Sequence, residues 1–212
     1  MRDLNLADLF NIFTRNFNSM NYLMLSGAFV PLKLANRSIA YKALAVLIGT
    51  AFLAVSSWIS VPMVPVPVTM QTFAVTMVGA LYGWRLGGIT VIAWLFESFV
   101  GLPVLANGMP GQIAFAGPTA GYLVSFPVVA AFVGFLAERG FTRNPFASFG
   151  VMLLGNALCL VLGAFWLANI IGFEKAWTFG VAPFIAGGVL KSALAAATIE
   201  LLRRSGIMVR LS

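Results

Sequence analysis

The chain has 212 residues, of which 60% are hydrophobic and 9% charged. Soluble domains average about 45–50% apolar and about 25% charged residues, and a soluble fold of this size could not bury so much apolar surface. The 13 Lys and Arg residues, against 6 Asp and Glu, stand between apolar runs without forming a basic face, which argues against binding of nucleic acid. The composition therefore predicts an all-α membrane protein.

Residues 1–36 alternate apolar and polar side chains and lack the short apolar core of a cleavable signal peptide. The pattern is typical of a helix that lies on the membrane surface. A disordered tail, or translation that begins at Met20, fits the same residues. We treat residues 1–36 as an N-terminal segment, residues 37–204 as the membrane domain and residues 205–212 as a cytoplasmic tail.

Six apolar runs follow the N-terminal segment. A helix that crosses a bilayer needs roughly 20 mainly apolar residues, and the second run is short by this measure. The runs cover about residues 40–60, 69–82, 86–100, 117–137, 146–171 and 179–202. We therefore expect six transmembrane helices in a single membrane domain.

The basic residues predict the orientation of these helices. With a cytoplasmic N-terminus, Lys175 alone faces outward, Lys191 lies inside the last run, and the remaining 11 of the 13 Lys and Arg residues face the cytoplasm. This asymmetry follows the positive-inside rule, whereas five or seven helices would scramble it. We expect both termini on the cytoplasmic side of the cytoplasmic (inner) membrane.

Two connections on the predicted outer side are unusually apolar. Residues 60–68 are rich in proline, residues 101–116 are rich in glycine and proline, and neither segment contains a charge. Proline and glycine disfavour regular helix there, and irregular backbone near the membrane needs protein or a cavity to satisfy its polar groups. We expect two apolar lid loops that fold over the bundle, with ordinary short turns as the alternative.

Apart from Lys42 and Glu200, which lie within two residues of a helix end, two charged residues, Glu97 and Lys191, lie inside the predicted helices. Such residues are costly in a bilayer, which makes them candidates for ligand binding. Each could contact a ligand, or the two could satisfy each other. Both therefore enter the set of candidate binding residues.

Other polar and aromatic side chains extend this set. Gln71 and Asn156 are amides that need partners when buried, and the partner is either a ligand or another helix. Thr69 could contact a ligand or cap the second helix, and Asn107 could do so or serve as a turn residue. Trp166 could pack a flat ligand or a neighbouring helix.

The sequence offers little material for catalysis. It has no Gly-Lys-Ser/Thr phosphate loop and no histidine, and its one cysteine, Cys159, lacks metal-ligand spacing. A lipid-acting intramembrane enzyme would have to use Glu97 and Lys191 as its catalytic pair. We expect no enzyme activity, no cofactor and no metal, so a role in binding and transport remains.

Several segments, in order and almost without gaps from about residue 40 to 204, resemble the BioY-type biotin transporters. They are residues 61–72 (VPMVPVPVTMQT), 82–87 (YGWRLG), 101–106 (GLPVLA), 117–123 (GPTAGYL), 163–167 (GAFWL) and 183–191 (PFIAGGVLK). The resemblance implies a substrate-binding S component of an energy-coupling factor (ECF) transporter, with six helices and the vitamin bound on the outer side. It adds Tyr122 to the candidate binding residues.

The resemblance also implies partners and raises one question. S components of this kind pair with a transmembrane coupling protein and two ATPase subunits, although some biotin members work without them. Their proposed mechanism is toppling of the S component within the membrane.

The spacing of Gly79, Gly83 and Gly87 permits close helix contacts, either inside the bundle or with a partner, including a second copy. The family usually has Asp where this chain has Gly188, so a biotin relative such as dethiobiotin is the alternative substrate.

Overall fold

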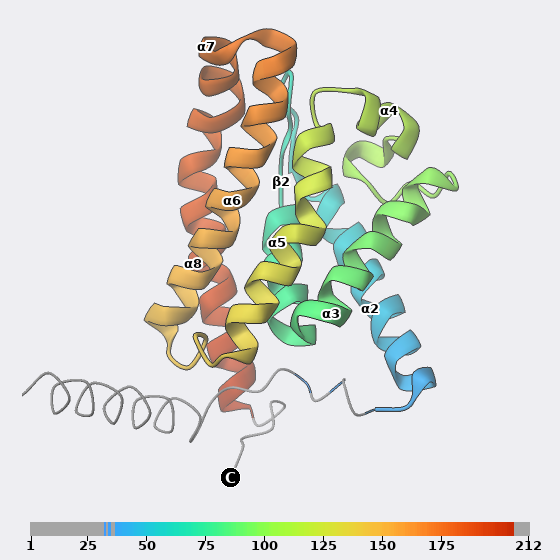
Figure 1. Cartoon of the computed structure of the whole chain (residues 1–212), viewed down its shortest axis with the longest axis vertical. Helices are drawn as coiled ribbons and strands as arrows, with labels where there is room; N and C mark the ends of the chain where they lie inside the picture. Colours follow the sequence, from blue (N-terminus) through green and yellow to red (C-terminus); the bar gives the residue numbers. More distant parts are fainter. Residues whose placement is uncertain (1–31, 33, 35–36, 206–212) are drawn as a thin grey trace, which may run out of the picture.

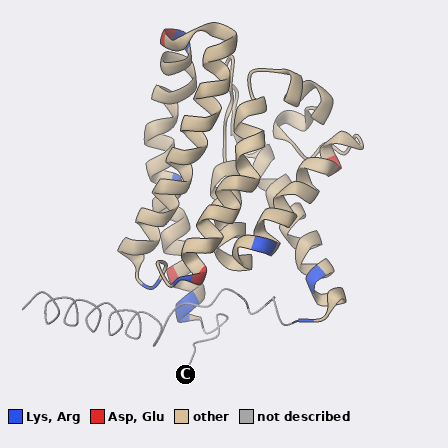
Figure 2. Cartoon of the chain, in the orientation of Figure 1, with Lys and Arg blue, Asp and Glu red and all other residues tan. Residues whose placement is uncertain are grey.

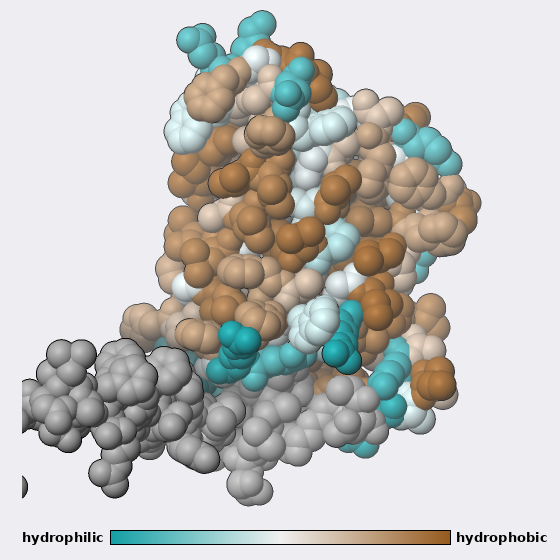
Figure 3. All heavy atoms as spheres, viewed as in Figure 1, coloured by the Kyte–Doolittle hydropathy of each residue, from teal (hydrophilic) through white to brown (hydrophobic). Residues whose placement is uncertain are grey.

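The computed structural model describes residues 32, 34 and 37–205, and the expectations for residues 1–31 and 206–212 lie outside them. Within this part the chain folds into a bundle of long helices (Figure 1). Five of them are long and apolar enough to cross a membrane, as expected for a multi-pass membrane protein. The space-filling view shows mainly apolar side chains over the middle of the bundle and polar ones near its two ends (Figure 3).

Four of the expected apolar runs correspond to single helices. They are α2 (Ile39–Trp58), α5 (Ala120–Glu138), α6 (Pro145–Ile171) and α8 (Ala182–Arg204). Side-chain caps set two of the starts, because Ser38 Oγ accepts from the Tyr41 amide and Asn144 Oδ1 from the Ala147 amide. The predicted all-α class is therefore confirmed.

The second and third runs together form α3 (Gln71–Phe99), which is broken at Gly83. Gly83 has φ 80° and ψ 177°, a conformation that glycine adopts readily because it has no Cβ. The second arm then turns back along the first: a Cβ placed on Gly87 would lie 3.0 Å from Gly79 Cα. The Glu138 carboxylate at the end of α5 accepts from the Trp84 amide, 3.2 Å away, and so caps the second arm. The expected count of six helices thus depends on counting the arms, residues 71–82 and 84–99, separately.

Shorter elements occupy one end of the bundle, here called the hairpin end. The strands β1 (Ser60–Val61) and β2 (Val68–Thr69) pair antiparallel and carry the proline-rich loop 62–67 between them. The turn η2 (Ala106–Gly108) and the helix α4 (Gly111–Ala116) follow α3. The helix α7 (Phe173–Ala176) and the π-helical turn η3 (Trp177–Val181) connect α6 to α8.

One expectation about these connections is wrong, because α4 is a regular helix inside the segment 101–116. Its six residues begin directly after Pro110 and end before Gly117. Proline at a helix start loses no intrahelical hydrogen bond, so it limits the helix without preventing it.

The opposite end, here called the basic end, holds most of the described Lys and Arg residues (Figure 2). It holds the start of α2, the break in α3 and the last residues of α5 and α8. Glu200 lies there too, paired with Arg203 and Arg204 at 2.7 Å each. The charge asymmetry read from the sequence is thus also an asymmetry in space.

Candidate functional site

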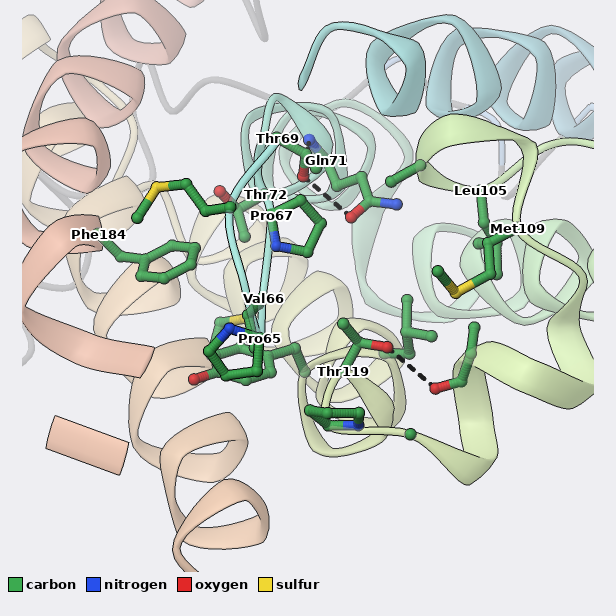
Figure 4. Close-up of a pocket in the computed structure, with 18 of the residues that line it drawn as sticks. Pro65, Val66, Pro67, Thr69, Gln71, Thr72, Leu105, Met109, Thr119 and Phe184 are labelled. Carbon is green, nitrogen blue, oxygen red and sulfur yellow. Dashed lines mark hydrogen bonds between the residues drawn. The ribbon is translucent and has the colours of Figure 1, made fainter. Parts of the chain in front are cut away.

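A cavity of about 360 Å³ lies toward the hairpin end, within the size range of small-molecule sites. Its walls come from loop 62–67, the start of α3, the segment 105–119, and α5, α6 and α8. Figure 4 shows Pro65, Val66, Leu105, Met109 and Phe184 around it. The walls are mainly apolar, and a few polar groups reach the cavity between these side chains.

Lys191 is the only charged side chain among the described residues that line the cavity. It is 8% exposed, and its Nζ donates to the backbone oxygen of Thr69 at 2.9 Å. A lysine ammonium has three N–H groups, so this bond leaves two for a ligand. In the described part of the chain no carboxylate forms an ion pair with Lys191. The buried cation therefore still needs an electron-rich partner.

Gln71 and Thr69 form one buried network beside Lys191. The Thr69 hydroxyl donates to Gln71 Oε1 at 2.9 Å (Figure 4), and Gln71 Nε2 donates to Ser57 Oγ at 3.2 Å. The network thereby links α8, β2, α3 and α2. These bonds use one of the two N–H groups and one of the two oxygen lone pairs of the Gln71 side chain, so its amide holds the cavity wall in place and keeps a donor and an acceptor for a ligand.

Asn156 lies in the wall formed by α6. Its Nδ2 donates to the Met152 backbone oxygen at 3.0 Å and to Ser192 Oγ at 3.1 Å. The hydrogen bonds of the described residues leave its Oδ1 without a donor. An amide whose two N–H groups are fixed in this way presents a carbonyl acceptor in a known direction.

Tyr122 contributes its ring to the wall and its hydroxyl to the fold. The ring stacks on Phe184 with centroids 6.2 Å apart, and the hydroxyl donates to the Gly180 backbone oxygen at 2.8 Å. Gly180 belongs to η3, so this bond connects α5 to the turn that precedes α8.

Asn107 lines the cavity from the second expected lid. Its φ of 55° is left-handed, a conformation that asparagine tolerates better than most residues. Its Oδ1 accepts from Ser60 Oγ at 3.1 Å, and Trp58 Nε1 donates to the Pro103 oxygen at 3.0 Å. The two apolar segments therefore meet over the cavity and are tied to each other.

Trp166 and Glu97 do not line the cavity. Trp166 is 42% exposed, and its Nε1 donates to the Gly117 oxygen at 3.2 Å, so it supports the wall from outside. Glu97 is half-buried near the end of α3. Among the described residues no ion pair joins it to Lys191, and none of their His, Cys, Asp and Glu side chains gather as a metal site.

Known proteins are similar to this chain in both sequence and architecture. The sequence model of the BioY family matches residues 25–207. The chain belongs to the BioY family. Among its relatives are a probable biotin transporter BioY of Pyrococcus horikoshii, 35% identical over 153 residues (72% of this chain and 90% of the relative), and the biotin transporter BioY of Thermotoga maritima, 35% identical over 150 residues (70% and 88%). A crystal structure described as the S-component for biotin from an ECF-type ABC transporter superimposes with a TM-score of 0.69 at 28% identity, covering 79% of this chain and 95% of that one.

Within this BioY chain, Gly188 leaves open space on the cavity wall. It lies one turn before Lys191, and a Cβ placed on it would have Asn156 Cβ, 3.9 Å away, as its nearest neighbour. That distance is an ordinary van der Waals contact. The region between Asn156 and Lys191 is therefore open to a ligand group or to a longer side chain.

Three polar or thiol side chains of the cavity wall, those of Thr72, Thr119 and Cys159, are not among the candidate binding residues selected from the sequence. Cys159 is 1% exposed and lines the wall, with Ser125 Oγ donating to its Sγ at 3.4 Å. Thr72 lines the wall as well, and its buried hydroxyl has no hydrogen-bond partner among the described residues. An apolar run signals neither property, since a cysteine or a threonine is common in membrane helices for packing alone.

Proposed function

We propose that this chain is the substrate-binding S component of an ECF-type ABC transporter and that it takes up biotin across the cytoplasmic membrane. The observation that carries the proposal is the apolar cavity with the buried, carboxylate-free ammonium of Lys191 on its wall. The names of the relatives and of the similar crystal structure support biotin as the ligand.

The chemistry of biotin matches this wall. Biotin combines an apolar thioether ring and alkyl chain with a ureido group and a carboxylate. The apolar side chains suit the ring and the chain, because burying apolar surface contributes about 25 cal/mol per Å². The free N–H groups of Lys191 suit the ureido oxygen or the carboxylate, and Asn156 Oδ1 suits a ureido N–H.

Orientation follows from the charge distribution. With the basic end in the cytoplasm, the hairpin end and its cavity face outward, as uptake requires. Loop 62–67 and the segment 101–116 then act as lids over the bound vitamin. Lys175, in α7 at the hairpin end, is the outward-facing cation of the described chain.

Transport also needs an energy source. The sequence has no phosphate loop, so ATP hydrolysis comes from two ATPase subunits that act through a transmembrane coupling protein. In that assembly the S component topples within the membrane and carries the cavity from one side to the other.

The alternative of a lipid-acting enzyme rests on a Glu97–Lys191 pair. Only Lys191 lines the cavity, and its hydrogen bond is to Thr69. The geometry therefore favours binding over catalysis.

The test is titration calorimetry of the detergent-purified chain with biotin, beside Lys191→Met and Lys175→Met. Both variants lose one lysine charge, but only Lys191 lines the cavity. We expect one-to-one binding by the wild type and by Lys175→Met. Loss of a buried charged hydrogen-bond partner predicts a Kd for Lys191→Met that is higher by about 30-fold or more.

Three results would decide against parts of the proposal. A folded wild-type chain that does not bind biotin rejects biotin as the ligand, and tighter binding of dethiobiotin in a parallel titration identifies the alternative substrate. Equal affinities of the wild type and Lys191→Met would remove Lys191 from the site.

A further inference from the structure

Four hydroxyl side chains line the cavity in the described part of the chain: Thr69, Thr72, Thr119 and Tyr122. Thr69 donates to Gln71 Oε1 at 2.9 Å, Thr119 to the Ala114 oxygen at 3.0 Å, and Tyr122 to the Gly180 oxygen at 2.8 Å. The Thr72 hydroxyl is buried and makes no such bond. It is thus the one hydroxyl of this wall that the protein leaves unsatisfied.

The start of α3 explains why Thr72 lacks a partner. A threonine inside a helix usually donates to a backbone oxygen three or four residues earlier, as Thr76 does to Thr72 and Phe73 at 3.0 Å each. For Thr72 those positions are Thr69 and Val68, which lie in β2 before the helix begins at Gln71. The Thr69 backbone oxygen, moreover, already accepts a hydrogen bond from the Lys191 ammonium at 2.9 Å.

We infer that the Thr72 hydroxyl hydrogen-bonds a polar group of the bound ligand and is a specificity-determining residue of the cavity. This inference rests on the proposed function. Lys191 bonds to the oxygen three residues before Thr72, so the ammonium and the hydroxyl serve neighbouring parts of the wall (Figure 4 shows Thr69 and Thr72). A hydroxyl can donate to a ureido or carboxylate oxygen or accept from a ureido N–H, and biotin offers all three.

The ligand has to supply this bond. Any water that partners the hydroxyl in the ligand-free protein is displaced when a ligand fills an apolar cavity. A ligand that leaves the hydroxyl buried and unpartnered loses the free energy of that bond, whereas one that pairs with it gains affinity and orientation. Thr72 thereby favours ligands whose polar group lies next to the start of α3 when they are bound.

The experiment replaces Thr72 with valine, which keeps the shape and removes the hydroxyl, and with serine, which keeps the hydroxyl. Thr76→Val is the matched control, because Thr76 lies one helical turn further on, does not line the cavity and bonds within its own helix. Biotin affinity is measured by titration, and the apparent melting temperature (Tm) is measured without ligand.

We expect the Kd of Thr72→Val for biotin to rise about 5- to 12-fold, which equals about 1–1.5 kcal/mol. Thr72→Ser and Thr76→Val should stay within about twofold of the wild type. The ligand-free Tm of Thr72→Val should be equal or higher, because replacing an unpartnered buried hydroxyl with a methyl group costs the fold nothing.

Thr72→Val with wild-type affinity would overturn the inference while leaving the proposed function intact. A lower ligand-free Tm together with equal losses of affinity in Thr72→Val and Thr76→Val would overturn it as well, since that pattern indicates a packing role. A wild-type chain that does not bind biotin would instead reject the proposed function.

Discussion

Lys191 of α8 donates from Nζ to the backbone oxygen of Thr69, which is 2.9 Å away and 122 positions earlier in the chain. The bond fastens the last helix of the bundle to the strand that carries the proline-rich loop. Thr69 in turn bonds to Gln71 at the start of α3. A ligand that contacts Lys191 therefore lies where α8, the hairpin and α3 are joined at the cavity wall.

Replacing Gly83 with alanine should destabilise the fold. Its φ of 80° and ψ of 177° lie in a region that is essentially limited to glycine and costs an L-residue about 1–3 kcal/mol, and the Glu138 carboxylate occupies the space of the new Cβ. For a chain of this size we expect a fall in Tm of about 2–12 °C in detergent. Gly150→Ala is the control, because an added Cβ meets nothing within 4 Å and Gly150 lies inside α6. Equal Tm values for the two variants would contradict the break as described.

Tyr122→Phe separates the two roles of that side chain. The ring that stacks on Phe184 remains, while the hydrogen bond to the Gly180 oxygen is lost. We expect a stability loss of about 1 kcal/mol and a change in biotin Kd below about threefold. Tyr41→Phe, at an exposed position of α2, should change neither. A large rise in Kd without a loss of stability would mean that the hydroxyl contacts the ligand instead.

Gly188→Asp tests the open space between Asn156 and Lys191. A carboxylate there gains the Lys191 ammonium as a partner and offers an acceptor to a ureido N–H. Since a buried hydrogen bond to a charged group contributes about 1.5–3 kcal/mol, we expect the Kd for biotin to fall by about tenfold or more. Gly150→Asp is the control, because it adds the same charge in α6 outside the cavity lining, where an added Cβ meets nothing within 4 Å. Weaker binding in Gly188→Asp alone would indicate that the ligand already occupies this space.

The single cysteine provides a direct report of occupancy. Cys159 lines the cavity at 1% exposure, so a small alkylating reagent reaches it only through the cavity or through local opening. We predict that saturating biotin slows the alkylation of Cys159, measured by mass spectrometry, by about tenfold or more. Bound biotin fills the cavity and stabilises the folded state by mass action, so both routes to the thiol become rarer.

The control for this measurement is Ser205→Cys in a Cys159→Ala background. Ser205 is exposed after the end of α8, so its alkylation should not respond to biotin. Equal alkylation rates of Cys159 with and without biotin would place the ligand elsewhere.

Some of the site could be predicted from the sequence. Lys191 stood out because a charge within an apolar run is costly, and Gln71 and Asn156 because buried amides need partners. The structure places all three on the cavity wall, together with Thr69, Asn107 and Tyr122. Glu97 meets the same criterion as Lys191 but does not line the cavity, because the energetic cost of a charge within an apolar run does not tell which way its side chain points.

Hydropathy and charge are local properties of the chain, so the membrane character, the positions of the long helices and the asymmetry of basic charge follow from the residues alone. Which faces of the helices meet depends on how the helices pack in three dimensions. These helices are apolar both toward lipid and toward each other, so no amphipathic stripe marks the buried side. The break at Gly83 and the unpartnered hydroxyl of Thr72 likewise depend on neighbours distant in sequence, namely Glu138 and Lys191, which only folding brings close.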